Sequence, residues 1–323
     1  TSPADHMKLK SMLQKRLRTR TNPFPKNRAA SLDDIVFLPA NLSRLVIDPY
    51  REACKVTTDL ANKLDLHHPF LVTGFDNESQ EIFEAMSQGC TLSKTPYLGS
   101  KNPGDNTTWI QLSTSLEDRD ITASGYVHYL KGDCKPVQLA GASSEQLVGY
   151  AISSSDNIEQ VISSALENEH DILVLDCTGN LDSSESELAA APDFSILRDA
   201  IHTLRKMKKE EAIELIYYGG VRSGTDAAKL IGLGANAVVL GVFAGLAMGG
   251  EIQNNKILYS TNYSESDRIQ GLVNIVKANT GEASMMARCT GKTNLYNVEP
   301  EDLSAITSKT SKATGIPLPG ECT

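Results

Sequence analysis

Short apolar runs alternate with amphipathic segments along most of the chain from Pro69 onward. Apolar runs bounded by turn-forming residues are typical of strands buried in a parallel sheet, and amphipathic segments between them are typical of the helices that cover it. The pattern predicts eight strands: Phe70–Thr73, Cys90–Ser93, Trp109–Leu112, Val127–Leu130, Leu147–Ile152, Ile172–Asp176, Ile213–Tyr218 and Ala237–Gly241. It predicts helices over Glu78–Gln88, Asn157–Glu169, Asp193–Met207 and Thr225–Gly234. Eight strands with interleaved helices favour an α/β fold of the (β/α)8 TIM barrel type over an open doubly wound sheet.

The segments around the predicted barrel have a different pattern. Residues 69–250 are expected to form the barrel, between a basic arm with an N-terminal helical extension (residues 7–68) and a C-terminal helical tail (residues 251–323). The clearest helix of the N-terminal extension is predicted over Arg51–Leu64. The acidic segment Leu181–Ala191 is interpreted as a flexible loop after the sixth strand. Residues 1–6, which precede the first methionine, resemble a remnant of an expression vector.

One uncharged stretch, Leu230–Met248, is long enough to cross a bilayer as a single helix. Four glycines within it contradict that interpretation, because they divide it into the end of one helix, a short apolar run and the start of another helix. This order is typical of a buried parallel sheet with covering helices. We therefore expect core structure here and no membrane association.

Composition and charge narrow the class of protein. The 323 residues are 40% hydrophobic and 22% charged, which is ordinary for a globular protein and excludes collagen-like and wholly disordered chains. The formal net charge of −9 argues against nucleic acid as a partner. Residues 7–28 hold eight Lys or Arg and no acid, so the rest of the chain carries −17. This basic arm is interpreted as a solvated helix, with an organelle-targeting peptide or a contact to an acidic partner as alternatives.

The six cysteines show neither a CxxC pair nor a neighbouring histidine at zinc-ligand spacing. They indicate reduced thiols of a cytoplasmic protein, and no metal site is expected. No apolar secretory signal opens the chain, so export is not expected.

The strongest chemical signal follows the predicted seventh strand, in Gly219-Gly220-Val221-Arg222-Ser223-Gly224-Thr225. Adjacent glycines let the backbone approach a ligand, and the N–H groups at the start of the following helix favour an anion. The eighth strand ends in a second such turn, Gly241-Val242-Phe243-Ala244-Gly245. Active sites of barrels lie at the C-terminal ends of the strands, and paired turns after strands seven and eight are typical of phosphate sites. Glycines that merely shape tight turns are the alternative.

These two turns, together with Leu233-Gly234-Ala235-Asn236 and the N-terminal run from Leu32 to Leu42, resemble the FMN-binding (β/α)8 domain of the glutamate synthase family. The resemblance implies FMN as the cofactor and places its ring near Thr73, Gly74 and Gln111. It implies that the phosphate lies on the two turns, with these residues in contact: Gly219, Gly220, Arg222, Ser223, Gly224, Gly241, Val242, Phe243 and Ala244. Lys135 matches the lysine of the family's Lys-Pro-Gly loop and would lie near the ring or the substrate.

The chain also departs from that family. The Lys-Pro loop is followed by Val137 in place of glycine, and Cys289 stands without the other cysteines that would ligate an iron–sulfur cluster. No N-terminal nucleophilic cysteine is present, so a complete glutamate synthase is not expected from this polypeptide alone. Electrons would come from a partner subunit or from NAD(P)H, because no dinucleotide-binding fingerprint is present.

The leading hypothesis is therefore an FMN-dependent oxidoreductase that transfers a hydride between flavin N5 and a small amino-acid-like or imine substrate. Gln111, Lys135 and Asp176 are the expected catalytic contacts. A non-catalytic FMN-binding or scaffolding subunit of a larger synthase, and a flavin-free phosphate-binding lyase or isomerase, are the alternatives. The oligomeric state stays open, with a homo-oligomer allowed.

Some further side chains have both a chemical and a structural interpretation. Asp176 ends the predicted sixth strand and either acts on the substrate, by orienting an amine or as a base, or caps the next loop. Its neighbour Cys177 is better interpreted as a small buried residue than as a nucleophile. His67, His68 and His128 are interpreted as structural. Lys94 and Lys101 flank the loop after the predicted second strand, and one of them is a candidate to meet a substrate carboxylate, with a solvated loop lysine as the alternative.

Overall fold

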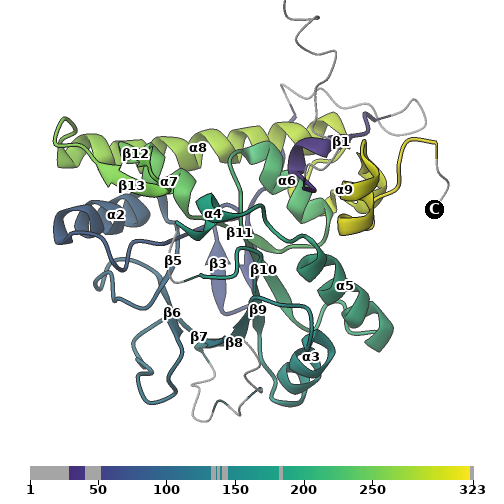
Figure 1. Cartoon of the computed structure of the whole chain (residues 1–323), viewed down its shortest axis with the longest axis horizontal. Helices are drawn as coiled ribbons and strands as arrows, with labels where there is room; N and C mark the ends of the chain where they lie inside the picture. The colour runs from purple at the N-terminus through teal and green to yellow at the C-terminus, as the bar shows by residue number, and fades with distance from the viewer. Residues whose placement is uncertain are drawn as a thin grey trace, which may run out of the picture.

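The structure is a computed structural model that describes residues 29–40, 52–131, 136, 139, 145–181 and 185–320. Eight parallel strands close into a barrel, in which the last strand pairs with the first through Val239 and Leu71 (Figure 1). The strands are β4 (Phe70–Thr73), β5 (Tyr97–Gly99), β6 (Trp109–Ser113), β7 (Gly125–Leu130), β8 (Leu147–Ile152), β9 (Ile172–Asp176), β10 (Glu214–Tyr218) and β11 (Ala237–Leu240). The predicted TIM barrel is confirmed.

Strand residues alternate between two apolar layers, as the pleat requires. One layer fills the inside of the barrel and contains Leu71, Ile110, Val127, Val174 and Ile216. The other lies between the outside of the barrel and the helices. These helices are α2 (Gln80–Ser93), α3 (Ile158–Glu167), α5 (Ser195–Met207), α6 (Gly224–Gly232) and α7 (Val242–Ala247), with the short α4 (Ser186–Ala189) after β9.

The long helix α8 (Glu265–Cys289) crosses the flank of the barrel where the first and last strands meet (Figure 1). It packs on α2, α7 and α6 in turn. Each of these contacts has a glycine at its closest point, because a side chain there would collide with the neighbouring helix. A Cβ atom added to Gly89 would lie 2.9 Å from Leu272. A Cβ atom added to Gly271 would lie 2.0 Å from the Ala247 oxygen, and one added to Gly224 would lie 2.1 Å from the Asn279 oxygen. Close helix packing therefore fixes where α6 begins.

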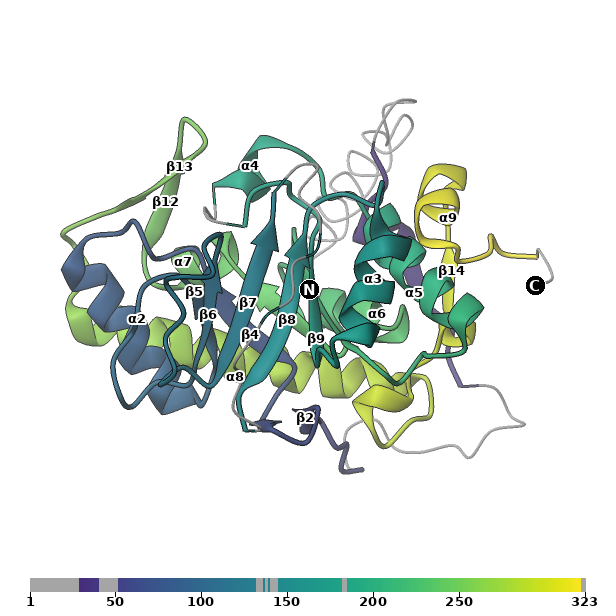
Figure 2. The same ribbon diagram turned by 90° about the horizontal axis from the view of Figure 1, so that it is seen from below.

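The chain segments before and after the barrel add small sheets. β1 (Ile35–Phe37) pairs with β14 (Leu303–Ala305) beside the 3-10 turns η1 (Leu32–Asp34), η2 (Leu295–Asn297) and η3 (Pro300–Asp302). β2 (Thr58–Leu60) and β3 (Leu64–Leu66) form a hairpin, and Figure 2 shows β2 below the N-terminal ends of the barrel strands. β12 (Gly250–Gln253) and β13 (Lys256–Tyr259) form another hairpin, and α9 (Ser308–Thr314) lies near the C-terminus.

Three sequence expectations are wrong. Arg51–Leu64 does not form a helix, because the described part of it contains β2 and the start of β3. Residues 90–93 are the last turn of α2, which Lys94 ends in a left-handed conformation, and the second barrel strand is β5 instead. The segment Leu181–Ala191 contains α4 where only a loop was expected. The basic arm, residues 7–28, lies outside the described residues.

The uncharged stretch Leu230–Met248 has the predicted order of elements, since it contains the end of α6, then β11, then α7. No helix in the described part of the chain has both the length and the apolar character needed to cross a membrane.

Candidate active site

The mouth of the barrel is lined by the inward-facing residues at the C-terminal ends of the strands. By the alternation along each strand, these include Thr73, Tyr129, Asp176 and Tyr218, with Gly241 directly after β11. Helix α4 lies beyond these strand ends (Figure 2), on the side where barrel active sites are found. The hydroxyl of Thr73 donates to the Leu98 carbonyl at 2.7 Å.

Asp176 is fully buried, and its carboxylate is held by four donors. The backbone N–H and the hydroxyl of Thr178 and the N–H of Gly179 donate to Oδ1, and the Tyr129 hydroxyl donates to Oδ2 at 2.6 Å. Burial, followed by the charge of Asp176, raises the pKa of Tyr129, so its hydroxyl stays protonated. Of the two interpretations of Asp176, the cap for its own loop is therefore the one that the geometry favours.

The structure contradicts the expected place of Gln111. Its neighbours Ile110 and Leu112 face the inside of the barrel, so Gln111 faces outward. Its amide nitrogen donates to the Asp118 carbonyl at 2.7 Å, and its amide oxygen accepts from the Asp120 N–H at 2.7 Å. Gln111 thus fixes the loop after β6 and does not reach the mouth.

Two backbone N–H groups at the ends of β10 and β11 face one acceptor, the carboxylate of Glu187 on α4. The Val242 N–H donates to Oε2 at 3.2 Å, and the Gly220 N–H also faces the carboxylate. Gly220 has a φ of 66°, a left-handed conformation that favours glycine. We call the space bounded by Gly220, Tyr218, Gly241 and Val242 the N–H cradle; Glu187 fills it.

Glu187 satisfies the N–H cradle only in part. Its Oε1 and the Tyr218 hydroxyl are buried and have no hydrogen bond of normal geometry. A Cβ atom on Gly241 would lie 3.0 Å from both atoms, so they share one small space. Burial raises the pKa of Glu187 to about 8. The Val242 and Gly220 N–H groups oppose this rise, and the charge of Asp176 adds to it by less than either of them. Burial and the nearby Glu187 likewise raise the pKa of Tyr218, and the interaction with the Ser186 hydroxyl lowers it.

The N-terminus of α6, which was expected to bind the same anion, is closed by another carboxylate. Glu282 on α8 accepts from the Gly224 N–H at 3.1 Å and from the Thr225 hydroxyl. The Ser223 hydroxyl caps the helix by accepting from the Asp226 N–H at 3.0 Å. Gly224 and Ser223 are therefore structural, and they do not join the N–H cradle.

Arg222 is likewise paired with carboxylates of the same chain. Its guanidinium donates to Asp33 at 2.7 Å and to Asp226 at 3.3 Å. The Arg222 hydrogen bond lowers the pKa of Asp33, and the same bond raises the pKa of Arg222. Both hydrogen-bond partners of the guanidinium are therefore carboxylates of the protein itself.

The remaining predicted residues divide into three groups. Lys135 lies outside the described residues. Gly74 follows Thr73 with a φ of 91°, Gly219 lies against Cys177 and Thr178, and Phe243 and Ala244 lie within α7, so these stay near the mouth. Cys177 is buried, as expected, and burial raises the pKa of its thiol.

Most of the other polar candidates have structural roles. His68 is buried and contacts the Ser93 carbonyl, and His128 faces outward between inward-facing neighbours. Lys94 precedes β5 and so lies at the wrong end of the strand, whereas Lys101 follows it and donates to Gln80 at 3.0 Å.

Sequence reasoning missed Tyr129, Tyr218 and Glu187. The two tyrosines carry a signal that could have been used, because each stands two residues after an inward-facing apolar residue near the end of its strand. Glu187 carries none, since an acid in a Ser- and Glu-rich segment is usually exposed.

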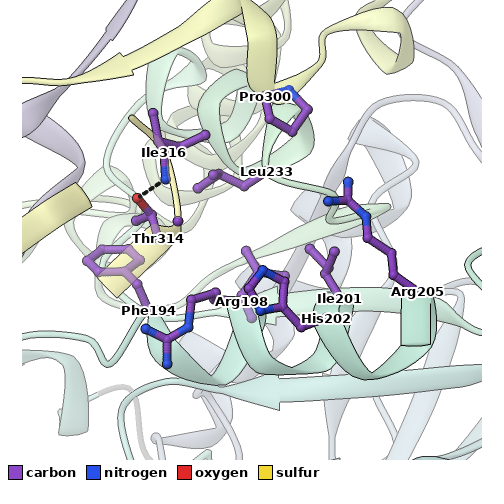
Figure 3. Close-up of a pocket in the computed structure, with 11 residues that line it drawn as sticks. Phe194, Arg198, Ile201, His202, Arg205, Leu233, Pro300, Thr314 and Ile316 are labelled. Carbon is purple, nitrogen blue, oxygen red and sulfur yellow. Dashed lines mark hydrogen bonds between the residues drawn. The ribbon is translucent and has the colours of Figure 1, made fainter. Parts of the chain in front are cut away.

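A separate pocket of about 70 Å³ lies on the outside, between α5 and the segment around α9 (Figure 3). Arg198, His202 and Arg205 line it together with apolar side chains. Arg198 is already paired with Asp199 and donates to the Lys312 carbonyl. No strand end of the barrel contributes to this pocket, so the mouth remains the candidate active site.

Comparisons with known proteins point to the same part of the chain. Residues 181–261 match the family model of FMN-dependent dehydrogenases. This segment includes α4, β10, β11 and α7, and hence the whole N–H cradle. The match confirms the expectation of FMN as cofactor and supports FMN-dependent oxidoreductase chemistry.

Relatives along the whole chain are distant. A glutamate synthase large subunit-like protein of Rhizobium meliloti (strain 1021) is 22% identical, over 91% of this chain and 89% of the relative. A mutant flavocytochrome b2 with pyruvate bound has a TM-score of 0.59 at 19% identity, over 90% of this chain and 80% of that one. A mandelate oxidase variant has a TM-score of 0.56 at 15% identity, over 83% and 85%. These structures share the fold.

Proposed function

We propose that this chain binds FMN at the mouth of the barrel and acts as an oxidoreductase on a small amino-acid-like or imine substrate. The observation that carries the proposal is the N–H cradle, where Gly220 and Val242 direct two backbone donors from adjacent loops at one buried acceptor. Such donors are what a phosphate monoester needs. Bound FMN would supply hydride transfer between its N5 and a substrate carbon.

The residues of the N–H cradle fit a phosphate. The buried Tyr218 hydroxyl has no hydrogen bond of normal geometry, so it is a third donor for a group with three terminal oxygens. Gly241 leaves room there, because a Cβ atom would lie 3.0 Å from the hydroxyl oxygen. Gly220, Val242 and Tyr218 would thus hold the phosphate, with Thr73 and Gly74 at the neighbouring end of β4.

The negative charge of Asp176 at the mouth suits a nitrogen-containing substrate. Asp176, whose oxygens are engaged by four donors, supplies negative charge that would attract an ammonium or iminium group. A hydroxy acid, such as the mandelate named for one structural neighbour, needs a base to take its hydroxyl proton. His67, His68, His128, His170 and His202, the histidines within the described residues, all lie before a strand, on its outer face or on α5.

The test starts from the colour of the purified full chain. The protein is expected to be yellow and to release FMN on denaturation. After anaerobic photoreduction, the flavin is expected to be reoxidised by a 2-oxo acid with ammonium and not by the 2-oxo acid alone. Reduction of the oxidised flavin by lactate or mandelate would instead assign the chain to hydroxy-acid chemistry.

A second function has one observation in its favour. The polar atoms of Asp176 and Gln111, both expected to be catalytic, are engaged within the protein. This suits an FMN-binding subunit whose chemistry is completed by a partner chain. That role would be supported if the chain binds FMN but no small acceptor reoxidises the reduced flavin.

A further inference from the structure

We propose that Glu187 is an internal competitor of the phosphate ligand: its carboxylate occupies the N–H cradle, and a phosphate monoester binds only by displacing it. This inference rests on the proposed function, because it takes FMN as the natural phosphate monoester. It assigns to Glu187 control over both the strength and the pH dependence of binding.

The geometry places Glu187 where a phosphate would lie. Its Oε2 accepts from the Val242 N–H at 3.2 Å, and the Gly220 N–H faces the same carboxylate. A phosphate bound to these donors would have its oxygens at the positions of the carboxylate oxygens. Both groups cannot occupy this space at once, because their oxygens would take the same positions against the same donors.

Glu187 is a weak occupant of this space. One of its oxygens, Oε1, is buried without a hydrogen bond, and the nearby buried hydroxyl of Tyr218 has no hydrogen bond of normal geometry, with Ser186 as its polar neighbour. A phosphate has one more terminal oxygen than a carboxylate and can accept from Tyr218 in addition to the two N–H groups. The exchange therefore pairs a buried donor that Glu187 leaves unpaired.

Displacement of Glu187 is coupled to loss of a proton. Among the described residues, the titratable groups that face it are Asp176 at the end of β9 and Tyr217 and Tyr218 at the end of β10, and these three include no cation. In the N–H cradle, burial raises the pKa of Glu187 from its ordinary value of 4.5 to about 8. Moved into water, the group regains its ordinary pKa and ionises. Higher pH therefore favours displacement between pH 4.5 and 8, and with it ligand binding.

The experiment measures FMN and riboflavin binding by fluorescence, at pH 6.5 and pH 8, with inorganic phosphate as a separate ligand. It uses the full chain and the variants Glu187→Ala, Glu187→Gln and Glu185→Gln. Riboflavin lacks the phosphate group, so it reports on the ring site alone. Glu185→Gln is the matched control, since it changes an acid two residues away.

The wild type is expected to bind FMN about tenfold more tightly at pH 8 than at pH 6.5. Most of this change cannot come from the ligand, because the second pKa of a phosphate monoester is about 6. Glu187→Gln keeps a neutral amide in the N–H cradle, so its FMN affinity is expected to be nearly constant. Glu187→Ala is expected to bind FMN at least about tenfold more tightly than the wild type at pH 6.5. Glu185→Gln should follow the wild type, and riboflavin affinity should be the same throughout.

The proposal is overturned if Glu187→Ala binds FMN as the wild type does, or more weakly. It is also overturned if Glu187→Ala gains as much affinity for riboflavin as for FMN. Failure of the proposed function looks different: no variant then binds either flavin. In that case inorganic phosphate decides, because tighter phosphate binding by Glu187→Ala than by the wild type upholds the competitor role. Equal phosphate binding by the two proteins would refute it.

Discussion

Two glutamates meet backbone N–H groups next to the same glycine-rich loop, yet their surroundings differ. Glu282 extends from the 25-residue helix α8 and uses both oxygens, on the Gly224 N–H and the Thr225 hydroxyl. Glu187 extends from the four-residue helix α4 and leaves Oε1 buried and unpaired. The first is part of a helix–helix contact, and the second fills a space that it satisfies poorly.

The difference shows how a ligand site can be told from a structural cap. Helix N-termini and glycine turns supply similar N–H donors, so the donors alone do not identify a site. At α6 the acceptor is matched to its donors and held by close packing. At the N–H cradle, Glu187 gives the Tyr218 hydroxyl no hydrogen bond of normal geometry, which marks the place where a larger anion fits.

The largest effect is expected for Gly224→Ala, which tests the close packing of α6 on α8 that holds Glu282 in place. A Cβ atom there would lie 2.1 Å from the Asn279 oxygen and 2.7 Å from the Ala283 nitrogen on α8. The free energy of unfolding, measured by denaturant titration, is expected to fall by at least about 3 kcal/mol. Gly281→Ala on α8 is the control, because nothing lies within 4 Å of its Cβ position. It should stabilise the protein by about 0.5–1 kcal/mol. Similar losses in both variants would show that α6 and α8 do not pack as described.

The pH dependence of stability tests the other carboxylate. The pKa of Glu187 is higher in the folded protein, at about 8, than its ordinary 4.5. Its contribution to stability is therefore complete below pH 4.5 and is lost as the pH rises towards 8. The loss is expected to reach about 1.4 kcal/mol per pH unit, until the ionised side chain leaves the N–H cradle.

Glu187→Gln is expected to lack this part of the pH dependence. Burial also raises the pKa of Glu214, to about 7, so some dependence remains in both proteins. Denaturant titrations at pH 5, 6.5 and 8 give the free energy of unfolding of both proteins. The value for the variant relative to that for the wild type should rise with each increase in pH. Parallel curves for the two proteins would mean that Glu187 is not buried at the mouth.

Val242→Pro removes a single donor from the N–H cradle. Val242 is the first residue of α7, a position that tolerates proline, so the main change is loss of the N–H. A hydrogen bond to a charged group is worth about 1.5–3 kcal/mol, and the competing Glu187 loses its own weaker bond to the same N–H, so FMN affinity is expected to fall about tenfold. Riboflavin affinity should be unchanged. Equal effects on both ligands would place the phosphate elsewhere.

The smallest effect is expected for Arg222→Gln. Arg222 and Asp33 are each about half exposed, and such pairs contribute less than about 1 kcal/mol. The free energy of unfolding of the variant should fall by less than about 1 kcal/mol, and by less still in high salt. Its FMN affinity should stay within about twofold of the wild-type value. A large drop in FMN affinity would return Arg222 to the phosphate site and would weaken the contrast between the two glutamates.

The barrel could be predicted because burial in a parallel sheet leaves continuous apolar runs. Seven of the eight strands lie where the sequence places them. The exception is instructive: Cys90 faces the core from the last turn of α2, so the run after it resembles a strand. The Arg51–Leu64 pattern failed for a related reason, since short hairpin strands such as β2 and β3 are too brief to show a period of two.

The candidate site was predicted only in part. A turn is set by a few neighbouring residues, whereas the direction and partners of a side chain depend on residues far along the chain. The glycine turns at Gly220 and Gly241 were found from spacing alone. Gln111 was assigned to the mouth although its parity on β6 directs it outward, and Arg222 was assigned to a phosphate although Asp33 reaches it from far along the chain. Glu187 becomes significant only through the fold, which buries an acid from an acidic segment.

Helix α8 also constrains when the barrel can be completed during synthesis. It joins α2, which follows the first strand, to α6 and α7, which flank the last, and Gln88 donates to Glu265 across 177 positions of sequence. Contacts of such long range slow folding and form late. During synthesis this seam can therefore form only after α8 has left the ribosome, and until β11 pairs with β4 both strands have an open edge.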